Sequence, residues 1–507
     1  MLHDYIKKIL NAPVYDVAIQ SPLDPAPSLS QRLGAKVWLK REDLQPVFSF
    51  KLRGAYTKMI TLNAAQRARG VIAASAGNHE QGVALAAKKL KIKAVIVMPA
   101  TTPEIKVKAV QGYGAEAVLF GDAYDEAYAH ARKIAKRKKL VFIHPYDDPD
   151  VIAGQGTVGM EILRQHAGPL EAVFVPVGGG GLIAGIATYV KFARPDVKII
   201  GVEPDDADSL YQALKAGHRV KLDQVGIFAD GVAVAQTGEE TFRINEKLVD
   251  EVIRVSTDEI CAAIKDIFTD TRSVAEPAGA LDVAGAKIYA ARHSGKTKTG
   301  DLVAVVSGAN INFERLRHVA ERTAVGEKRE ILLAVELPET PGSLLKFCAL
   351  LGRRSITEFN YRYCSNEEAH VFAGVQVTDY EKEGPPLIAK LKHHGFKTRD
   401  LTENELAKEH VRYMIGGRPS KLVDEVLYRF EFPERPGALA KFLNAMSHKW
   451  NISLFHYRNH GAAFGRVLIG IQVPQKDRKD FDAFIRAMDF TAYDETGNAA
   501  YRMFLKN

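Results

Sequence analysis

The chain has 507 residues, of which 46% are hydrophobic and 26% are charged, and its formal net charge is +8. This length predicts two to four domains, and so mild a positive charge argues against nucleic acid as the partner. Three cysteines far apart in sequence, Cys261, Cys348 and Cys364, argue against a disulfide framework and a structural zinc site, and favour a cytoplasmic protein.

The N-terminal residues 1–5 have neither the basic start nor the apolar run of a signal peptide. No stretch of about 18 apolar residues predicts a membrane span. The densest basic run, Lys136–Lys139, is expected to end a solvated helix and not to bind nucleic acid. The modest positive charge therefore suits a small anionic ligand better than a polymer.

The first chemically distinctive segment is Ser49–Ala55 (SFKLRGA), which places Lys51 between an apolar segment and a predicted helix. A free lysine amine has a pKa of about 10.4 and is protonated in water. A buried lysine can lose this proton and form a Schiff base with an aldehyde cofactor. Most lysines only lie on solvated surfaces, so Lys51 becomes a candidate through the motifs that accompany it.

Short apolar runs alternate with amphipathic runs over the first 320 residues. Strands are predicted at 71–74, 94–98, 117–120, 172–177, 198–202 and 302–306, and helices at about 79–90 and 103–111. This alternation predicts an α/β fold with a buried parallel sheet. Ligands of such sheets bind beyond the carboxyl ends of the strands.

Three turns that follow predicted strands carry candidate ligand-binding residues. In the segment 75–82 (SAGNHEQG), Asn78 either caps a helix or donates a hydrogen bond to a ring hydroxyl. The run 178–182 (GGGGL) is either a flexible turn or a loop whose N–H groups converge on a phosphate. Ser307 opens the segment 307–310 (SGAN), which is either a simple turn or a contact to a heterocyclic nitrogen.

The pattern changes after residue 320, and the polar residues 321–330 are expected to be a linker. An internal repeat follows. Its matching segments are Glu336–Leu344 (ELPETPGSL) with Glu431–Leu439 (EFPERPGAL), and Ile356–Arg362 (ITEFNYR) with Ile452–Arg458 (ISLFHYR). We expect a first part over 1–320 and two related α+β modules over 331–409 and 426–507.

In this order, the four motifs of the first part resemble the pyridoxal-phosphate-dependent serine/threonine dehydratases, which have the tryptophan-synthase-β-like fold. The segments Lys40–Asp43 (KRED), Val151–Thr157 (VIAGQGT) and His410–Met414 (HVRYM) add to the likeness. The two C-terminal modules are similar to ACT-type regulatory domains. The whole chain thus resembles the biosynthetic threonine dehydratases (threonine ammonia-lyases), with small departures at Phe48 and Ala278.

The resemblance implies a role for each motif. Lys51 would be the catalytic residue that forms the Schiff base with pyridoxal 5′-phosphate, and Asn78 would hydrogen-bond its 3′-hydroxyl. Ser307 would face the pyridine nitrogen. The phosphate would be held by Gly178, Gly179, Gly180, Gly181 and Leu182. No metal ligand set is implied.

The resemblance also implies an activity and its control. The substrate would be L-threonine, and also L-serine, and threonine would yield 2-oxobutanoate and ammonia as the first step of isoleucine biosynthesis. Isoleucine would inhibit through the C-terminal modules and valine would oppose it, in a cytoplasmic homotetramer. Tyr361 and Tyr457 hold equivalent places in the two modules and either contact these effectors or pack between the modules.

Two other functions remain open at this point. The same cofactor site could racemise an amino acid or prefer serine, although simple racemases lack a doubled regulatory region. The chain could also be an inactive amino-acid sensor, although a sensor has no need of Lys51 and the glycine run.

Overall fold

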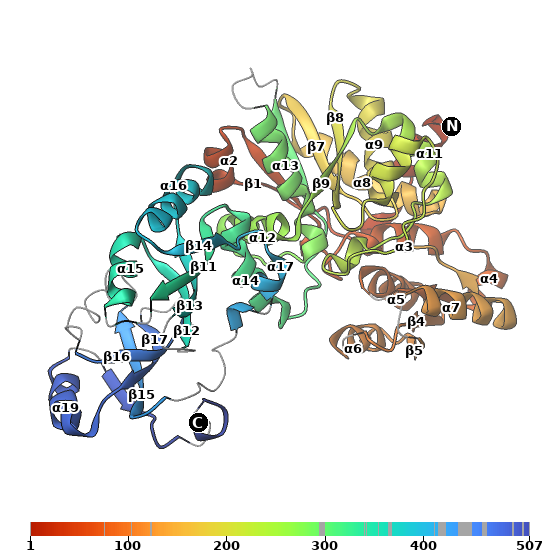
Figure 1. Ribbon diagram of the computed structural model, residues 1–507. Coiled ribbons are helices and arrows are strands. Elements are labelled where there is room, and N and C mark those ends of the chain that lie inside the picture. The colour runs from red at the N-terminus through yellow and green to blue at the C-terminus, as the bar shows by residue number, and fades with distance from the viewer. Residues whose placement is uncertain are drawn as a thin grey trace. The chain divides into compact units, whose positions relative to one another are not determined.

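The computed structural model describes residues 2–75, 77–102, 104–121, 124–293, 300–338, 340, 342–352, 354–362, 368–409, 411–413, 422–433, 449–458, 464–488, 491–498 and 501–505. These residues form two compact units, Met1–Thr323 and Ala324–Asn507 (Figure 1). Cys364, Ala76, His410, Met414 and parts of the repeat motifs around 339–341 and 434–439 lie outside the described residues.

Two sheets organise the first unit. The larger sheet has the order β1 (Leu23–Pro25), β2 (Val37–Arg41), β10 (Asp301–Val306), β7 (Leu170–Pro176), β8 (Lys198–Pro204) and β9 (Glu251–Val255). The smaller sheet has the order β5 (Glu116–Leu119), β4 (Ala94–Met98), β3 (Val71–Ala74) and β6 (Val141–Phe142). All neighbouring strands are parallel except β1 and β2.

Helices cover both faces of each sheet in this unit. The helices that begin in this unit are α1 (Leu2–Leu10), α2 (Pro27–Leu33), α3 (Lys51–Ile60), α4 (Ala64–Arg69), α5 (Asn78–Leu90), α6 (Glu104–Gly112), α7 (Tyr124–Lys138), α8 (Pro149–Gln165), α9 (Gly181–Ala193), α10 (Ser209–Ala216), α11 (Glu239–Leu248), α12 (Thr257–Thr271), α13 (Leu281–Arg292) and α14 (Arg315–Gly326). Short 3-10 turns lie at η1 (Val14–Asp16), η2 (Glu42–Leu44), η3 (Asp230–Val232) and η4 (Pro277–Gly279). No helix among the described residues is long and apolar enough to span a membrane.

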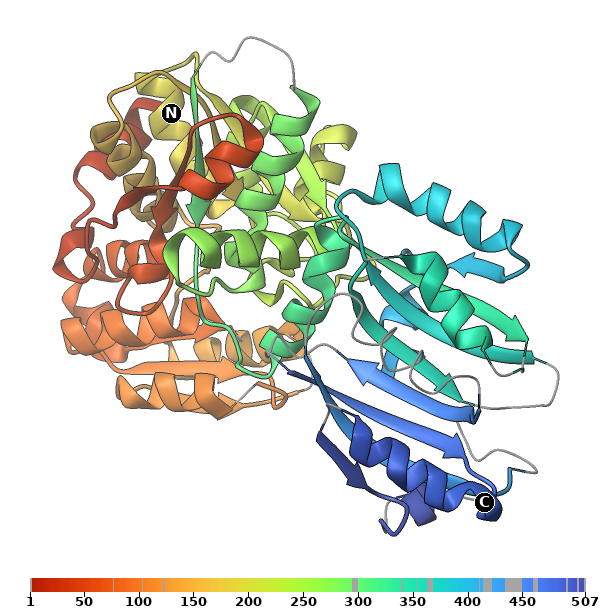
Figure 2. The same cartoon turned by 90° about the vertical axis from the view of Figure 1, so that its left-hand side faces the viewer.

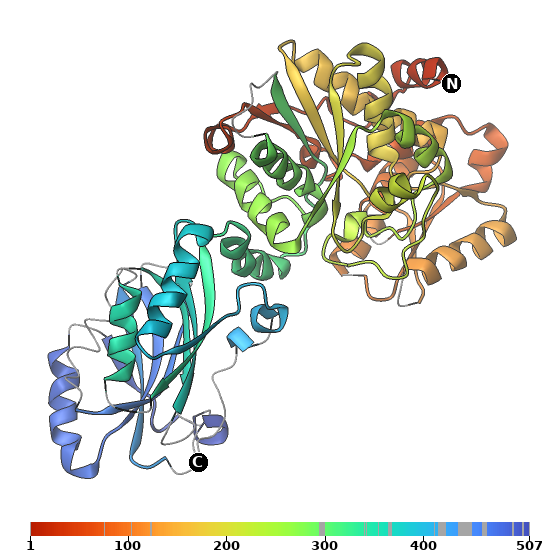
Figure 3. The ribbon, with the colours of Figure 1, turned by 45° about the horizontal axis from the view of Figure 1, so that its top comes forward.

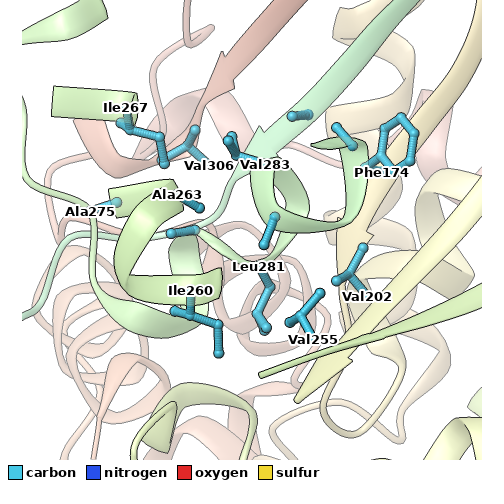
Figure 4. Close-up of a cluster of buried hydrophobic side chains, with 14 of the residues drawn as sticks. Phe174, Val202, Val255, Ile260, Ala263, Ile267, Ala275, Leu281, Val283 and Val306 are labelled. Carbon is cyan, nitrogen blue, oxygen red and sulfur yellow. The ribbon is translucent and has the colours of Figure 1, made fainter. Parts of the chain in front are cut away.

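The strands are buried on both faces, as expected for parallel strands between helix layers. Along β7, Val173 and Val175 belong to one apolar core, while Ala172 and Phe174 belong to another on the opposite face. Figure 4 shows part of this second core, where side chains of α12 and α13 meet those of β7, β8, β9 and β10. Fully buried apolar side chains on both faces leave only the strand ends for ligands.

The predicted α/β class is confirmed, and the six predicted strands and two predicted helices all form within two residues of the expected bounds. The predicted strands divide between two sheets, which the local patterns do not specify. The basic run 136–139 does end a solvated helix, since α7 stops at Lys138 and these side chains are exposed. The expected linker 321–330 includes the end of α14 and the first residue of β11.

One eight-stranded antiparallel sheet forms the second unit. Its order is β14 (Lys397–Asp400), β11 (Glu330–Pro338), β13 (Glu368–Gln376), β12 (Ile356–Arg362), β16 (Asn451–Arg458), β17 (Phe464–Gln472), β15 (Glu425–Pro433) and β18 (Thr491–Asp494). The two sequence repeats meet in its middle, where β12 pairs with β16. The order on one side of this pair repeats on the other.

Helices α15 (Ser343–Leu351), α16 (Tyr380–His393) and α19 (Arg478–Ala487) lie on one face of this sheet (Figures 2 and 3). Strand β11 alternates accordingly: Ile331, Leu333 and Val335 join the core beneath these helices, whereas Leu332 packs on the other face. The shorter elements are α17 (Glu405–Glu409), η5 (Val411–Tyr413), η6 (Gln475–Asp477) and η7 (Tyr501–Leu505). Alternation with period two is what a sheet with different partners on its two faces requires.

Candidate functional site

Lys51 is the first residue of α3, and the chain just before it is fastened to the end of β10. Phe48, where the sequence departs from the family pattern, has a φ of 55°, a left-handed conformation that bulky residues rarely adopt. Three backbone contacts hold this segment: a bridge between Ser49 and Gly308, the Phe50 N–H to the Ser307 carbonyl at 3.3 Å, and the Ala309 N–H to the Phe48 carbonyl at 2.9 Å. The fold therefore brings Lys51 and Ser307 together.

The Lys51 amine is weakly held. Its Nζ donates one long hydrogen bond, 3.3 Å, to the carbonyl of Pro145. Burial lowers the pKa of Lys51 to about 8, and the nearby carboxylates of Glu80 and Glu276 limit this decrease. A lysine with this pKa is partly neutral at physiological pH, which a nucleophilic amine requires.

Asn78 is the first residue of α5, which follows β3, and its amide makes hydrogen bonds to residues distant in the sequence. Gly77 is the residue at the N-cap position, and no side-chain capping bond forms there, so the alternative that Asn78 caps the helix is wrong. The Asn78 Nδ2 donates to Glu276 Oε1 at 2.5 Å, and its Oδ1 accepts from Asn310 Nδ2 at 2.6 Å. Asn78 therefore lies beside the Ser307–Asn310 segment, with one N–H of its amide still available.

Two buried ionisable residues follow Asn78 in α5. His79 Nε2 lies 3.0 Å from the Ile143 carbonyl, and burial lowers the His79 pKa to about 3, which makes it a neutral structural residue. Glu80 is fully buried, and this burial raises its pKa to about 7 against the opposing effects of Ser75 and Lys106. Burial likewise raises the pKa of Glu276 to about 7. Two carboxyl groups near Lys51 thus titrate close to neutrality.

The glycine run joins β7 to the start of α9, and close packing or backbone conformation favours glycine at Gly178, Gly179 and Gly180. A Cβ on Gly179 would lie 2.2 Å from the Tyr146 ring, and one on Gly178 would lie 2.9 Å from the Val232 Cα. Gly180 has a φ of 86°. The Gly179 carbonyl accepts from the Thr241 hydroxyl at 2.7 Å.

The amide groups of this run contrast with its carbonyls. Within the part of the chain that the structure describes, the N–H groups of residues 178–180 donate no hydrogen bond. The first N–H groups of α9, from Gly181 onward, also have no partner within their helix. Consecutive open N–H groups at a helix start form an anion site. The run adjoins Lys51 because Tyr146 packs on it and the Lys51 amine reaches Pro145.

Ser307 directly follows β10 and is 3% exposed. Its hydroxyl makes one long contact, 3.4 Å, to the carbonyl of Ala278, the second position where the sequence departs from the family pattern. A weakly engaged hydroxyl at a strand end can turn to a heterocyclic nitrogen.

The sequence motifs do not identify several residues of this site. Glu80 lies in the segment 75–82 and Glu276 two residues before Ala278, and the signal that could have marked them is an acidic residue among small and apolar neighbours. Nothing in the sequence singles out Pro145, Tyr146 or the 3-10 turn η3, because only the folded chain brings them to the glycine run.

The candidate effector residues lie at the join between the repeats. Tyr361 of β12 is opposite Phe455, and Tyr457 of β16 is opposite Phe359. Tyr361 is buried in the core beneath the helices, while Tyr457 is partly buried against it. Both therefore contribute to packing between the repeats.

The residues of the first unit fit pyridoxal phosphate. A loop of open N–H groups suits its phosphate, a desolvated amine suits its aldehyde, and the Asn78 amide and Ser307 hydroxyl suit the polar edges of its ring. These groups come from the carboxyl ends of β3, β7 and β10 and from the start of α3.

Comparison with known proteins agrees with this fit. Residues 14–308 match the family described as pyridoxal-phosphate dependent enzyme. Residues 321–411 and 416–505 each match the C-terminal regulatory domain of threonine dehydratase.

Individual relatives cover the whole chain. The chain is 57% identical to L-threonine dehydratase biosynthetic IlvA of Burkholderia multivorans over 506 residues, which is 99% of each chain. It is 50% identical to the corresponding Escherichia coli protein, covering 99% of this chain and 97% of that one. Among solved structures, the processed threonine deaminase isoform 2 of Solanum lycopersicum has a TM-score of 0.62 at 52% identity, over 64% of this chain and 88% of that one. Maize serine racemase has a TM-score of 0.59 at 31% identity, over 62% and 96%.

Proposed function

The chain belongs to the family of pyridoxal-phosphate-dependent threonine dehydratases, and from this premise we propose how its residues carry out the reaction of that family. It is a lyase that uses pyridoxal phosphate to convert L-threonine to 2-oxobutanoate and ammonia, and its C-terminal unit is regulatory.

Four elements would hold the cofactor. The Lys51 amine would bind its aldehyde carbon, and the open N–H groups of Gly178–Leu182 would bind its phosphate. Asn78 would donate its remaining N–H to the 3′-hydroxyl, and Ser307 would face the pyridine nitrogen. A serine leaves that nitrogen neutral, which favours prompt loss of a β leaving group.

When bound, the cofactor supplies an electron sink for the negative charge that develops at the substrate α-carbon. Lys51, once the substrate amine has replaced it, is free to take the α-proton. The lowered pKa of Lys51 suits this task, because an amine can accept a proton only while it is itself neutral. Glu80 and Glu276 lie near enough to stabilise the ammonium that results.

One observation carries the proposal: the part-buried, weakly bonded amine of Lys51 lies next to the open N–H groups of the glycine run. Borohydride reduction of the yellow holoenzyme, followed by peptide mass mapping, tests it. We expect bleaching and the mass of the reduced cofactor on the peptide that contains Lys51. A label on another lysine would reject this assignment, and a colourless protein would favour the inactive sensor.

Likeness to maize serine racemase over 62% of this chain favours the racemase alternative. Turnover of L-threonine, L-serine and D-serine by the same preparation separates the two. We expect L-threonine to have the largest kcat/KM, with L-serine as a second substrate. Faster interconversion of the serine enantiomers than threonine deamination would contradict the proposal.

We propose that isoleucine inhibits this enzyme through the modules 331–409 and 426–507, and that valine opposes isoleucine. The match of both repeats to a regulatory domain supports an amino-acid effector. Tyr361 and Tyr457 lie where the repeats pair, at β12 and β16, and would contact the effector there. To inhibit, the effector must bind one arrangement of this pairing more tightly than another.

The conservative pair Tyr361→Phe and Tyr457→Phe tests these positions without opening the core. If either hydroxyl contacts an effector, its removal weakens isoleucine inhibition or valine relief at least threefold, while threonine turnover without effectors is unchanged. Full sensitivity in both variants would assign the tyrosines to packing alone.

We further propose a cytoplasmic homotetramer. The wide spacing of the cysteines and the burial of Cys261 and Cys348 suit a reducing compartment. Light scattering of the purified enzyme at several concentrations measures the assembly, and a stable dimer would contradict the tetramer.

A further inference from the structure

The segment 228–232, which includes the 3-10 turn η3, contacts three parts of the first unit at once. It lies between β8 and β9 in the sequence, and no motif marks it. Its contacts with the candidate site, with the half of the unit that contains the smaller sheet, and with helix α14 are distinct and fall on successive residues.

Two residues of the segment touch the candidate site. A Cβ on Gly231 would lie 2.9 Å from the Ala278 side chain and 3.7 Å from both the Asn78 amide nitrogen and Glu276 Oε1. The backbone of Val232 packs against Gly178, where a Cβ would meet it at 2.9 Å. The segment therefore backs both the residue assigned to the cofactor ring and the first residue assigned to its phosphate.

Asp230 joins this segment to α6 beside the smaller sheet. Its Oδ2 lies 3.0 Å from the Nζ of Lys106, whose side chain is 7% exposed. The same Nζ would lie 3.9 Å from a Cβ on Gly77, the residue just before Asn78. A buried cation paired with Asp230 thus lies between the start of α5 and the segment.

Arg315 holds the same segment from helix α14. Its Nη1 donates to the Phe228 carbonyl at 2.9 Å and lies 3.5 Å from Asp230 Oδ1. One turn further along, the His318 ring lies 5.3 Å from the Phe228 ring. Asp230 is thus shared by a lysine beside the site and an arginine of α14.

Helix α14 spans the boundary between the two compact units in the sequence. It begins eight positions after Ser307 and ends at Gly326, past the boundary between the two compact units. Arg322 pairs with Asp258, and the Thr323 hydroxyl donates to the Cys261 carbonyl at 3.2 Å. The helix is therefore anchored in the first unit along its length and continues directly into the second.

We propose that Arg315 is a positioning residue that holds segment 228–232 against the residues assigned to the cofactor, and so makes their geometry depend on helix α14. The inference rests on the proposed function, because it assumes that the cofactor occupies this site. Loss of the Arg315 contacts would release one side of Asp230 and leave Gly231 and Val232 less firmly placed.

The test uses full-length holoenzyme carrying Arg315→Gln, Arg315→Lys or, as matched control, Arg317→Gln. Arg317 lies on the same helix and pairs with Glu321 four residues on. Dialysis against decreasing pyridoxal phosphate, read by the visible absorbance of the protein, gives the cofactor dissociation constant. Visible circular dichroism reports the geometry of the bound cofactor, and isoleucine titration reports the response to the second unit.

We expect Arg315→Gln to weaken cofactor retention about threefold to tenfold, the loss expected for one charge-assisted hydrogen bond and a part-exposed ion pair. Its circular dichroism changes, and the isoleucine concentration for half inhibition rises at least threefold. Arg315→Lys keeps the positive charge beside Asp230 and should therefore lose less cofactor affinity and less isoleucine sensitivity. Arg317→Gln should behave as the parent.

Two results would overturn the inference. Equal cofactor affinity and dichroism in Arg315→Gln and Arg317→Gln would remove Arg315 from the site, and unchanged isoleucine response would remove the link to α14. Failure of the parent enzyme itself to retain the cofactor would instead reject the proposed function, so the two failures are distinguishable.

Discussion

Two lysines of the first unit, the fully buried Lys40 and the partly buried Lys51, differ in how far their ammonium groups are hydrogen-bonded. The Lys40 amine donates to Glu161 Oε2 at 2.6 Å, to the Ser21 carbonyl at 2.7 Å and to Gln165 Oε1 at 2.9 Å. The Lys51 amine has one long bond, to the Pro145 carbonyl at 3.3 Å. All three donors of Lys40 are used, whereas Lys51 keeps donor capacity for a ligand.

Arg53 connects the surroundings of the two lysines. Arg53 is two residues after Lys51 in α3. It is fully buried between Glu42 and Glu161, with ion-pair distances of 2.8 and 2.6 Å. The charged cluster of Lys40, Glu42, Arg53 and Glu161 therefore anchors the helix that presents Lys51. Burial alone does not make a lysine reactive, since a fully paired lysine is structural and an underbonded one is available for chemistry.

Replacing each lysine by methionine, which has a similar volume, is the sharpest way to break this comparison. Lys51→Met is expected to lose about 10³-fold or more of threonine turnover, because both the covalent anchor and the base are removed. With cofactor removed from both proteins, its urea midpoint should equal or exceed that of the parent, because a desolvated, weakly bonded amine is gone. Retained turnover would end the assignment of Lys51.

Lys40→Met should do the reverse. Removing one member of the buried cluster leaves Glu161 less compensated and is expected to lower the free energy of unfolding of the first unit by about 3 kcal/mol. Urea unfolding followed with a probe in that unit measures the change. Turnover per folded molecule should stay within a few-fold of the parent at low temperature. An unchanged unfolding midpoint would mean that pairing does not distinguish the two lysines.

The pH dependence of cofactor uptake sharpens the comparison further. With a Lys51 pKa of about 8, the neutral amine increases about tenfold per unit below pH 8 and levels off above it. A solvated lysine would keep gaining until about pH 10.4. Stopped-flow uptake by cofactor-free enzyme from pH 6 to 10 measures the midpoint. Glu80→Gln should lower this midpoint, because the Glu80 carboxylate favours the protonated amine, and a rise would contradict the assigned electrostatics.

The smallest effect is expected at a solvated ion pair. Arg194 and Asp196 approach to 3.4 Å with side chains 33% and 67% exposed. Arg194→Ala should leave the urea unfolding midpoint close to that of the parent, because an exposed ion pair adds little stability. The same urea experiment provides a reference for Lys40→Met. Equal losses of unfolding free energy in the two variants would show that burial of the charged cluster adds no stability.

Much of the fold followed from local patterns. Val71–Ala74 and Ala94–Met98 were predicted residue for residue, because short apolar runs bounded by polar turns are typical of strands buried on both faces. The assignment of strands to two sheets could not be predicted, since identical local patterns suit either sheet. The role of Asn78 at its helix was similarly undecided, because capping depends on backbone angles that the residue type alone does not set.

The candidate site divides in the same way. Lys51, the glycine run and Ser307 were found because each stands in a motif beside a strand or helix end, where local sequence and ligand geometry are linked. Glu80 and Glu276 needed the fold, because their unusual pKa values come from burial and from neighbours distant in sequence. The Tyr361 and Tyr457 pairing partners needed the register of β12 against β16, although the repeat had already placed the two residues in equivalent positions.

The sequence by itself determined the α/β class, the repeat, the family and the lysine on which the proposed chemistry depends. These follow from periodicity and from motifs whose residues are close together in the chain. Only the tertiary structure decided which lysine is left with a single long hydrogen bond, which carboxyl groups face it, and how Asp230 lies between Lys106 and Arg315. Pairing and desolvation depend on distances between residues far apart in the chain, and those distances exist only once it has folded.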